Sequence, residues 1–177
     1  MLTLFGPIEL FYNLRTDLDK LRYATHITKI ISDVTVENEN SEEILQLFLN
    51  TLHMLANTDQ NMNFIISVFK LRLISRLGYT PHIKKCSVCG DLQKEDTLTY
   101  FSLKENGFKC DECGSGDKSA IKISSSTKDA IRYIILSPVK KIFAFHIPED
   151  SMKELELIAK IYLNEKLEKE YKLENLF

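Results

Sequence analysis

The sequence of 177 residues lacks a hydrophobic run long enough to cross a membrane. Its longest apolar stretch, residues 63–77, is interrupted by Lys70, Arg72 and Arg76, whereas a spanning helix needs about 20 predominantly apolar residues. The opening MLTLFGPIELF contains no Lys or Arg and includes Glu9, so it does not resemble a secretory signal. We therefore expect a cytoplasmic protein with no membrane partner.

The sequence also lacks the short motifs that mark common classes of enzyme. It contains no Gly-rich phosphate loop, no nucleophile elbow and no His-Glu-x-x-His pattern. Its 25 acidic residues form no pattern that singles out an acid–base pair. These absences predict a protein that is not an enzyme.

Cysteine is scarce, and all four cysteines lie in one stretch. Cys86 and Cys89 form one Cys-x-x-Cys pair, Cys110 and Cys113 form another, and twenty residues separate the two pairs. This spacing predicts a tetrahedral zinc site made by the four thiolates. Four thiolates leave no coordination position for water or substrate, so we expect one zinc ion with a structural role.

Two other interpretations of the cysteines are weaker. Disulfides need an oxidising compartment, of which the sequence gives no sign. A redox Cys-x-x-Cys usually begins a helix after a strand, and one pair is sufficient for it.

Gly90 and Gly114 each follow the second cysteine of a pair, where glycine relieves crowding in a tight backbone turn.

The residues between the two pairs predict a β-hairpin. Residues 97–103 read as a strand, and Asn106-Gly107 is a favoured two-residue turn because both positions tolerate positive φ. The second strand, Phe108-Lys109, would return the chain to Cys110 beside the first pair.

Apolar side chains spaced three and four residues apart predict three helices before the first cysteine pair. The expected N-caps are Thr16 for the first helix and Asn40 or Ser41 for the second. The third helix, at about residues 64–77, is apolar on most of its circumference and ends at Gly78. We expect this helix at the buried centre of a bundle.

Two more helices are predicted after the cysteines. Ser126 is the expected N-cap of the first, and a capping box from Ser151 to Glu154 is expected to open the second. Residues 120–123 read as a short extended piece, and residues 139–145 fit a short helix or a strand equally well.

These elements predict a mainly α fold, in which a helical bundle carries an inserted four-cysteine zinc-finger or ribbon module with a small β-hairpin. The expected divisions are a helical region of three helices at 1–80, the zinc-binding module at 81–118, and C-terminal helices at 119–177. Apolar content of 44% with 27% charged residues is ordinary for a globular protein of this length.

The segment LRLISRLGYTP, followed by CSVCG, an Asn-Gly hairpin and CDECG, resembles the RecO family of bacterial recombination mediators. The earlier segment NLRTDLDKLRYA is similar to the first helix of that family's helical region. The resemblance covers nearly the whole chain. RecO proteins normally begin with an OB-fold barrel, which binds single strands. Here the sequence starts almost at the first expected helix, so we expect the barrel to be missing, either because the sequence is a fragment or because the gene product is truncated.

The resemblance implies a non-enzymatic role in recombinational DNA repair. RecO proteins bind single- and double-stranded DNA, contact the C-terminal tail of the single-strand-binding protein, and join RecR to load recombinase. It also implies a cytoplasmic, nucleoid-associated location, and DNA binding weakened by the missing barrel. The alternative is a nucleic-acid-binding zinc ribbon of a transcription or translation factor, which shares the cysteine spacing but does not predict the three preceding helices.

Two arginines are candidates for partner binding. Arg72 and Arg76 lie four residues apart, and hence on one face of the third expected helix. Guanidinium groups beside an apolar surface would suit the acidic, apolar tail of a single-strand-binding protein. The alternative is that both only solubilise the C-terminal end of a buried helix, where cations are favourable.

Five lysines surround or follow the metal ligands and are candidates for DNA binding. They are Lys84, Lys85, Lys109, Lys118 and Lys122. They would contact phosphates, with neighbouring hairpin aromatics available for stacking. The alternative is that the lysines offset the negative charge of a zinc–thiolate site, while the aromatics pack inside the module.

Overall fold

The computed structural model describes residues 9–35, 41–91 and 98–173. The elements in chain order are α1 (Glu9–Thr16), α2 (Leu18–Val34), α3 (Ser41–Asn57), α4 (Met62–Arg76), β1 (Leu98–Ser102), β2 (Gly107–Cys110), α5 (Asp111–Gly114), β3 (Ile121–Lys122), α6 (Ser125–Leu136), the 3₁₀ turn η2 (Val139–Lys141) and α7 (Glu149–Lys166). The expected mainly α fold with a small antiparallel sheet and a four-cysteine cluster is confirmed. No helix among these residues is both long and apolar enough to span a membrane.

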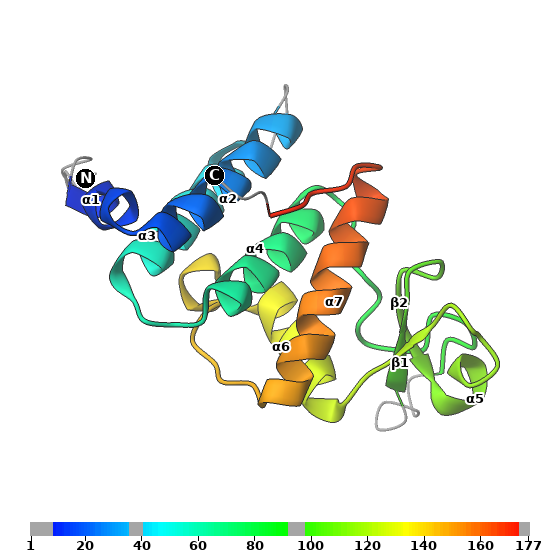
Figure 1. Ribbon diagram of the computed structural model, residues 1–177. Coiled ribbons are helices and arrows are strands. Elements are labelled where there is room, and N and C mark those ends of the chain that lie inside the picture. The colour runs from blue at the N-terminus through cyan, green and yellow to red at the C-terminus, as the bar shows by residue number, and fades with distance from the viewer. Residues whose placement is uncertain (1–8, 36–40, 92–97, 174–177) are drawn as a thin grey trace.

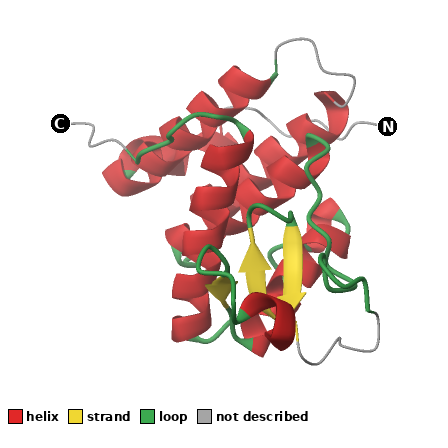
Figure 2. Ribbon diagram, turned by 90° about the vertical axis from the view of Figure 1, so that its right-hand side faces the viewer, coloured by secondary structure: helices red, strands yellow, loops and turns green. Residues whose placement is uncertain are grey.

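The helices surround α4. This helix contacts α2, α3, α6 and α7, and Figure 1 shows it running through the middle of the bundle. Every residue from 64 to 74 is buried, which confirms the central position expected from its apolar circumference. The strands lie at one end of the molecule, and Figure 2 shows the sheet there with the bundle behind it.

Helix α4 is capped at its start and ends at the glycine that the sequence predicted. Asn61 is the N-cap, and its side-chain oxygen accepts hydrogen bonds from the backbone N–H groups of Asn63 and Phe64 at 2.8 and 3.3 Å. At the other end the chain leaves the helix through Gly78, whose φ of +94° is rarely adopted by other residues.

Several helices begin at residues other than those that the sequence predicted. Thr16 is the last residue of α1, a helix that the sequence analysis did not anticipate, and the N-cap of α2 is Asp17. Helix α6 is capped by Ser124 and not by Ser126. Helix α3 begins at Ser41, whereas the alternative cap Asn40 lies outside the described residues.

The predicted capping box serves a different helix. Helix α7 begins at Glu149, and the carboxylate of Glu154 reaches across to the start of α6. There it accepts hydrogen bonds from the backbone N–H of Ser124 at 2.8 Å and from the hydroxyl of Thr127 at 2.5 Å. Burial raises the pKa of Glu154, but these hydrogen bonds outweigh it and lower the pKa overall. The carboxylate therefore ties α7 to α6.

The sheet has the order β2-β1-β3, and both pairings are antiparallel. The predicted extended piece supplies β3, whereas residues 139–145 form neither a strand nor a regular helix beyond η2. The predicted two-residue turn is wrong, because Gly107 already pairs with Ser102 and only Asn106 has a positive φ, of +53°. Gly107 serves instead for close approach, since a Cβ there would lie 2.4 Å from the carbonyl oxygen of His82.

Lys70 is a charged residue inside the bundle. The residue is only 7% exposed. It makes no hydrogen bond or ion pair with the described part of the chain. Burial lowers its pKa to about 8, the charge of Lys160 acts in the same direction, and Glu156 opposes them. The folded protein therefore binds this proton less tightly than the unfolded chain does.

Replacing Lys70 with Met should stabilise the protein at pH 7 by about 1–3 kcal/mol, because it removes a desolvated charge. In the wild type, the unfolded state binds more protons than the folded state between the folded pKa of about 8 and the unfolded value of about 10.4. Wild-type stability should therefore gain from this group as the pH rises through that window. Urea unfolding of both proteins at pH 7 and pH 10 measures the difference, with exposed Lys172→Met as the control. A stability gap that does not shrink between the two pH values would contradict the assignment.

Candidate metal centre

Two separate parts of the chain bring the four cysteines together. Cys86 and Cys89 lie in a turn closed by a hydrogen bond from Gly90 N–H to the Cys86 carbonyl at 3.0 Å, and Gly90 has a φ of +72°. Cys110 ends β2, and Cys113 lies in the short α5 that follows. Glycine after the first pair therefore serves the expected turn.

The four sulfur atoms fit a single metal ion. All lie within 4.8 Å of one another, and the Sγ atoms of Cys89 and Cys110 are 4.0 Å apart. A tetrahedron with metal–sulfur bonds of about 2.3 Å requires sulfurs about 3.8 Å apart. None of the four cysteines forms a disulfide. The cluster is therefore positioned to hold a metal ion.

The electrostatics of the cluster also favour a cation. Burial raises the pKa of the Cys86 thiol, but backbone N–H donors, including that of Cys110 at 3.4 Å, outweigh it and lower the pKa to about 6. The pKa of Cys113 rises to about 12, chiefly through its hydrogen bond with Cys110, because neighbouring sulfurs cannot all ionise without a counter-charge. A divalent ion would supply that charge.

Backbone hydrogen bonds fasten the first cysteine turn to the hairpin. The N–H of His82 donates to the Asn106 carbonyl at 2.7 Å, and the carbonyl of His82 accepts from Phe108 N–H at 3.0 Å. The N–H of Ser87 donates to the Phe108 carbonyl at 2.8 Å. Gly114 is required for packing, because a Cβ there would lie 2.4 Å from the ring of Tyr100.

Contacts that the sequence analysis missed join this module to the bundle. The guanidinium of Arg132, in α6, donates to the Ile83 carbonyl at 2.9 Å and lies 5.8 Å from the Phe108 ring centroid. The ring of Phe101 meets Tyr162 of α7 edge-on at 5.4 Å. Both phenylalanines of the hairpin are fully buried. These two phenylalanines are therefore unavailable for base stacking, and Phe101 packs against the bundle as well as within the module.

The two candidate arginines have different environments. Arg72 is 3% exposed, and its guanidinium donates to the carbonyl oxygens of Ile134, Ile135 and Ser137 at the end of α6. These include carbonyls that the helix itself leaves without partners. Arg76 is more accessible and forms an ion pair with Glu43 at 2.7 Å. Arg72 thus caps the C-terminal end of α6. Of the two arginines, only Arg76 reaches the surface.

The five candidate lysines also divide. Lys84, Lys85, Lys118 and Lys122 are exposed. Lys109 is 5% exposed and forms an ion pair with Asp117 at 2.6 Å. The hydrogen bond from Lys109 is the main reason that the pKa of Asp117 is lowered. Lys109 therefore holds the loop after α5 and does not extend the exposed basic surface.

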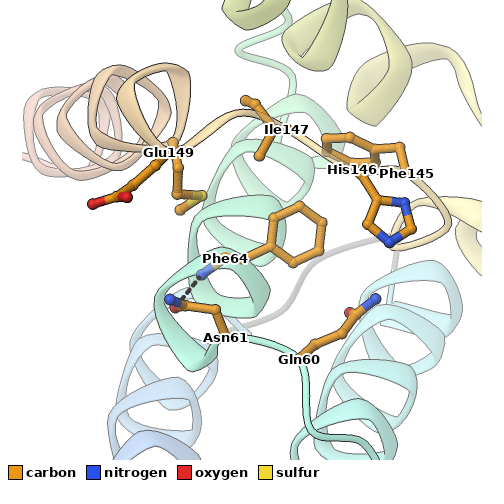
Figure 3. A pocket seen from close by; sticks show the side chains of 8 residues that line it. Gln60, Asn61, Phe64, Phe145, His146, Ile147 and Glu149 are labelled. Atoms are coloured by element: carbon orange, nitrogen blue, oxygen red, sulfur yellow. Dashed lines mark hydrogen bonds between the residues drawn. The ribbon is translucent and has the colours of Figure 1, made fainter.

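A hollow of about 380 Å³ lies where α4 and α7 begin. Figure 3 shows the rings of Phe64 and Phe145 with Ile147 around it, and the polar side chains of Gln60 and His146 at its edge. The two rings meet edge-on at 5.0 Å. No sequence motif identifies this hollow, because its walls come from segments far apart in the chain.

A comparison with known protein families covers nearly the whole chain, the four cysteines included. A family model described as "Recombination protein O C terminal" matches residues 15–174. The chain belongs to the RecO family. It is 41% identical to the "DNA repair protein RecO" of Acetivibrio thermocellus over 164 residues, which cover 93% of this chain and 64% of that protein. It is 29% identical to the protein of the same name from Alkaliphilus metalliredigens over 157 residues, which cover 89% and 63%.

The chain thus spans less than two thirds of the length of these RecO relatives. The family match includes the central helix α4, the cysteine module and the C-terminal helices. The four-cysteine cluster and the bundle that supports it therefore lie within the C-terminal region of RecO.

Proposed function

We propose that this chain acts in recombinational DNA repair as a non-enzymatic RecO-type mediator that helps to load recombinase on single-stranded DNA. The family match over residues 15–174 is the observation that carries the proposal. The proposed partners are RecR, the C-terminal tail of the single-strand-binding protein, and single- and double-stranded DNA. The alternative, a transcription- or translation-associated zinc ribbon, is disfavoured because the match extends over the helices on both sides of the cysteines.

The proposed metal is one zinc ion held by Cys86, Cys89, Cys110 and Cys113. The four sulfur donors lie close enough together for tetrahedral coordination, and they are a ligand set that structural zinc prefers. When bound, zinc would fix the first cysteine turn to β2 and α5 and would leave no position for a substrate. Its proposed role is to hold the exposed surface of the module in shape.

That surface is the proposed DNA contact. Lys84 and Lys85 precede the first cysteine pair, and Lys118 and Lys122 follow the second, and all four are exposed. Exposed lysines contact the phosphate backbone without reading sequence. The proposed role is therefore sequence-independent binding that supplements other contacts.

Metal analysis of the purified chain should give one zinc per chain. Replacing Cys113 with Ser should abolish stoichiometric zinc and lower the free energy of unfolding by about 3–5 kcal/mol, because the metal no longer ties the two segments together. Exposed Ser115→Ala, two residues away, is the matched control and should keep its zinc. Stoichiometric zinc in the Cys113→Ser protein would contradict the assignment.

The partner proposal is tested by capture of the chain on immobilised RecR and on a peptide of the single-strand-binding protein tail. We expect both to retain the chain. Arg76→Glu should weaken binding to the tail peptide about tenfold, because it places a carboxylate against an acidic ligand. Arg15→Glu, another exposed arginine, is the control. Capture by neither bait would overturn the partner proposal, and an unchanged affinity for Arg76→Glu would remove that residue from the contact.

DNA binding should depend on salt through the four exposed lysines. Each lost phosphate contact lowers the slope of log affinity against log salt by about 0.7 on single strands. A variant with Lys84, Lys85, Lys118 and Lys122 replaced by Gln should therefore bind more weakly, with a slope smaller by up to about 3. The double variant Lys153→Gln, Lys172→Gln carries exposed changes elsewhere and should keep the wild-type slope. Equal slopes in all three proteins would exclude this surface from DNA contact.

A further inference from the structure

The hollow where α4 and α7 begin has apolar walls that the bundle leaves partly uncovered. Phe145, Ile147 and Met152 line it and are only half-buried. The ring of Phe145 is held in position by two others, since its centroid lies 5.0 Å from that of Phe64 and 5.1 Å from that of Tyr133. The volume of about 380 Å³ is at the lower end of the range of about 300–1,000 Å³ for small-ligand sites. The walls therefore suit one apolar group of the size of an aromatic side chain, whose burial would be favourable.

Gln60 brings an unsatisfied hydrogen-bond acceptor to this hollow. Its Nε2 atom donates to the carbonyl of Phe143 at 3.4 Å, which identifies the other end of the amide as the oxygen. That oxygen, Oε1, is buried and accepts no hydrogen bond within the described ranges. Figure 3 shows the Gln60 amide beside the space bordered by the rings of Phe64 and Phe145. Because a hydrogen bond of 3.4 Å is long and weak, the amide can turn about its broad terminal torsion to meet a donor in the hollow.

The exposed charges next to the hollow are mainly negative. Glu149, which lines it, and Asp150 begin α7, while Asp59 lies in the loop before α4, and all three are exposed. The ammonium of Lys153 lies 3.5 Å from the carboxylates of both Glu149 and Asp150 and offsets part of their charge. Three carboxylates thus outnumber this ammonium, so a ligand with basic groups is favoured over an acidic one.

We propose that this hollow docks a Trp or Tyr side chain from a segment of a partner protein that carries Lys or Arg beside the ring. The ring covers Phe145, Ile147 and Met152. Its single N–H or O–H donates to Oε1 of Gln60, since buried Trp and Tyr usually need such a partner. The neighbouring cations face Glu149 and the other rim carboxylates. The site uses neither the cysteine ligands nor the exposed lysines of the module, so it is independent of the proposed zinc and DNA contacts.

The fluorescence of a peptide reports this binding directly, because the chain contains no Trp of its own. The probe is Lys-Trp-Lys with blocked termini, titrated with the full chain at pH 8, where His side chains are ordinarily neutral. We expect a saturable shift of the emission to shorter wavelength as the indole is buried. Displacement by blocked Lys-Tyr-Lys includes Tyr among the ligands, and its absence restricts the site to Trp. Blocked Glu-Trp-Glu should bind at least about tenfold more weakly.

Gln60→Leu tests the hydrogen bond inside the hollow. A second probe carries sulfur in place of the indole N–H, and the wild type should bind it about three- to tenfold more weakly than Lys-Trp-Lys, as measured by displacement. Gln60→Leu should bind both probes with equal affinity, because it has no acceptor to lose. A purely structural effect of the substitution would weaken both probes alike and keep their ratio. A preference for indole that survives in Gln60→Leu contradicts the role of Oε1.

A charge reversal tests the rim. The double variant Glu149→Lys, Asp150→Lys should bind Lys-Trp-Lys about tenfold more weakly than the wild type does. The control Glu42→Lys, Glu170→Lys makes the same change of charge in the first turn of α3 and beyond the end of α7, and should keep the wild-type affinity. The proposal is overturned if the wild type shows no saturable shift, if it binds Glu-Trp-Glu more tightly than Lys-Trp-Lys, or if both double variants lose affinity equally.

Discussion

The structure depends on the complete burial of α4. Ile65, Val68 and Phe69 are fully inaccessible, and four other helices cover the circumference on which they lie. Any cation on the middle of this helix is consequently carried into the interior, where it must find acceptors or lose its hydration without compensation. Arg72 finds them in the last carbonyls of α6, and so the charge becomes part of the packing between α4 and α6.

The cysteine module depends on the same helix. The chain leaves α4 through Gly78 and passes directly into the turn that carries Cys86, and the hydroxyl of Tyr162 in α7 donates to the Tyr79 carbonyl at 2.8 Å. Arg132 fixes the next part of this segment from α6. The bundle therefore sets where the first cysteine pair lies, while the cluster joins that pair to the second. Neither part alone places all four sulfurs.

Features defined by neighbouring residues could be predicted from the sequence, and features defined by distant residues could not. The cysteine spacing and the apolar circumference of α4 are local patterns, and they identified the family, the cluster and the bundle centre. The acceptors of Arg72 lie 62 to 65 positions further along the chain, a separation at which no pattern links residues. The motif from Ser151 to Glu154 was recognised as a cap but assigned to its own helix, because sequence alone does not reveal a carboxylate capping a neighbouring element.

The same distinction applies to the basic residues, and it changes how their charge should be understood. Counting lysines around the cysteines treats Lys109 and Lys84 alike. In the structure Lys109 is buried and forms an ion pair with Asp117, whereas Lys84 is exposed. A zinc ion with four thiolates would carry a net charge of about −2. Because Asp117 already pairs with Lys109, only the exposed lysines would balance that charge. Any phosphate backbone at this surface would therefore meet cations whose field is already partly offset, which favours a supplementary contact over a strong autonomous DNA site.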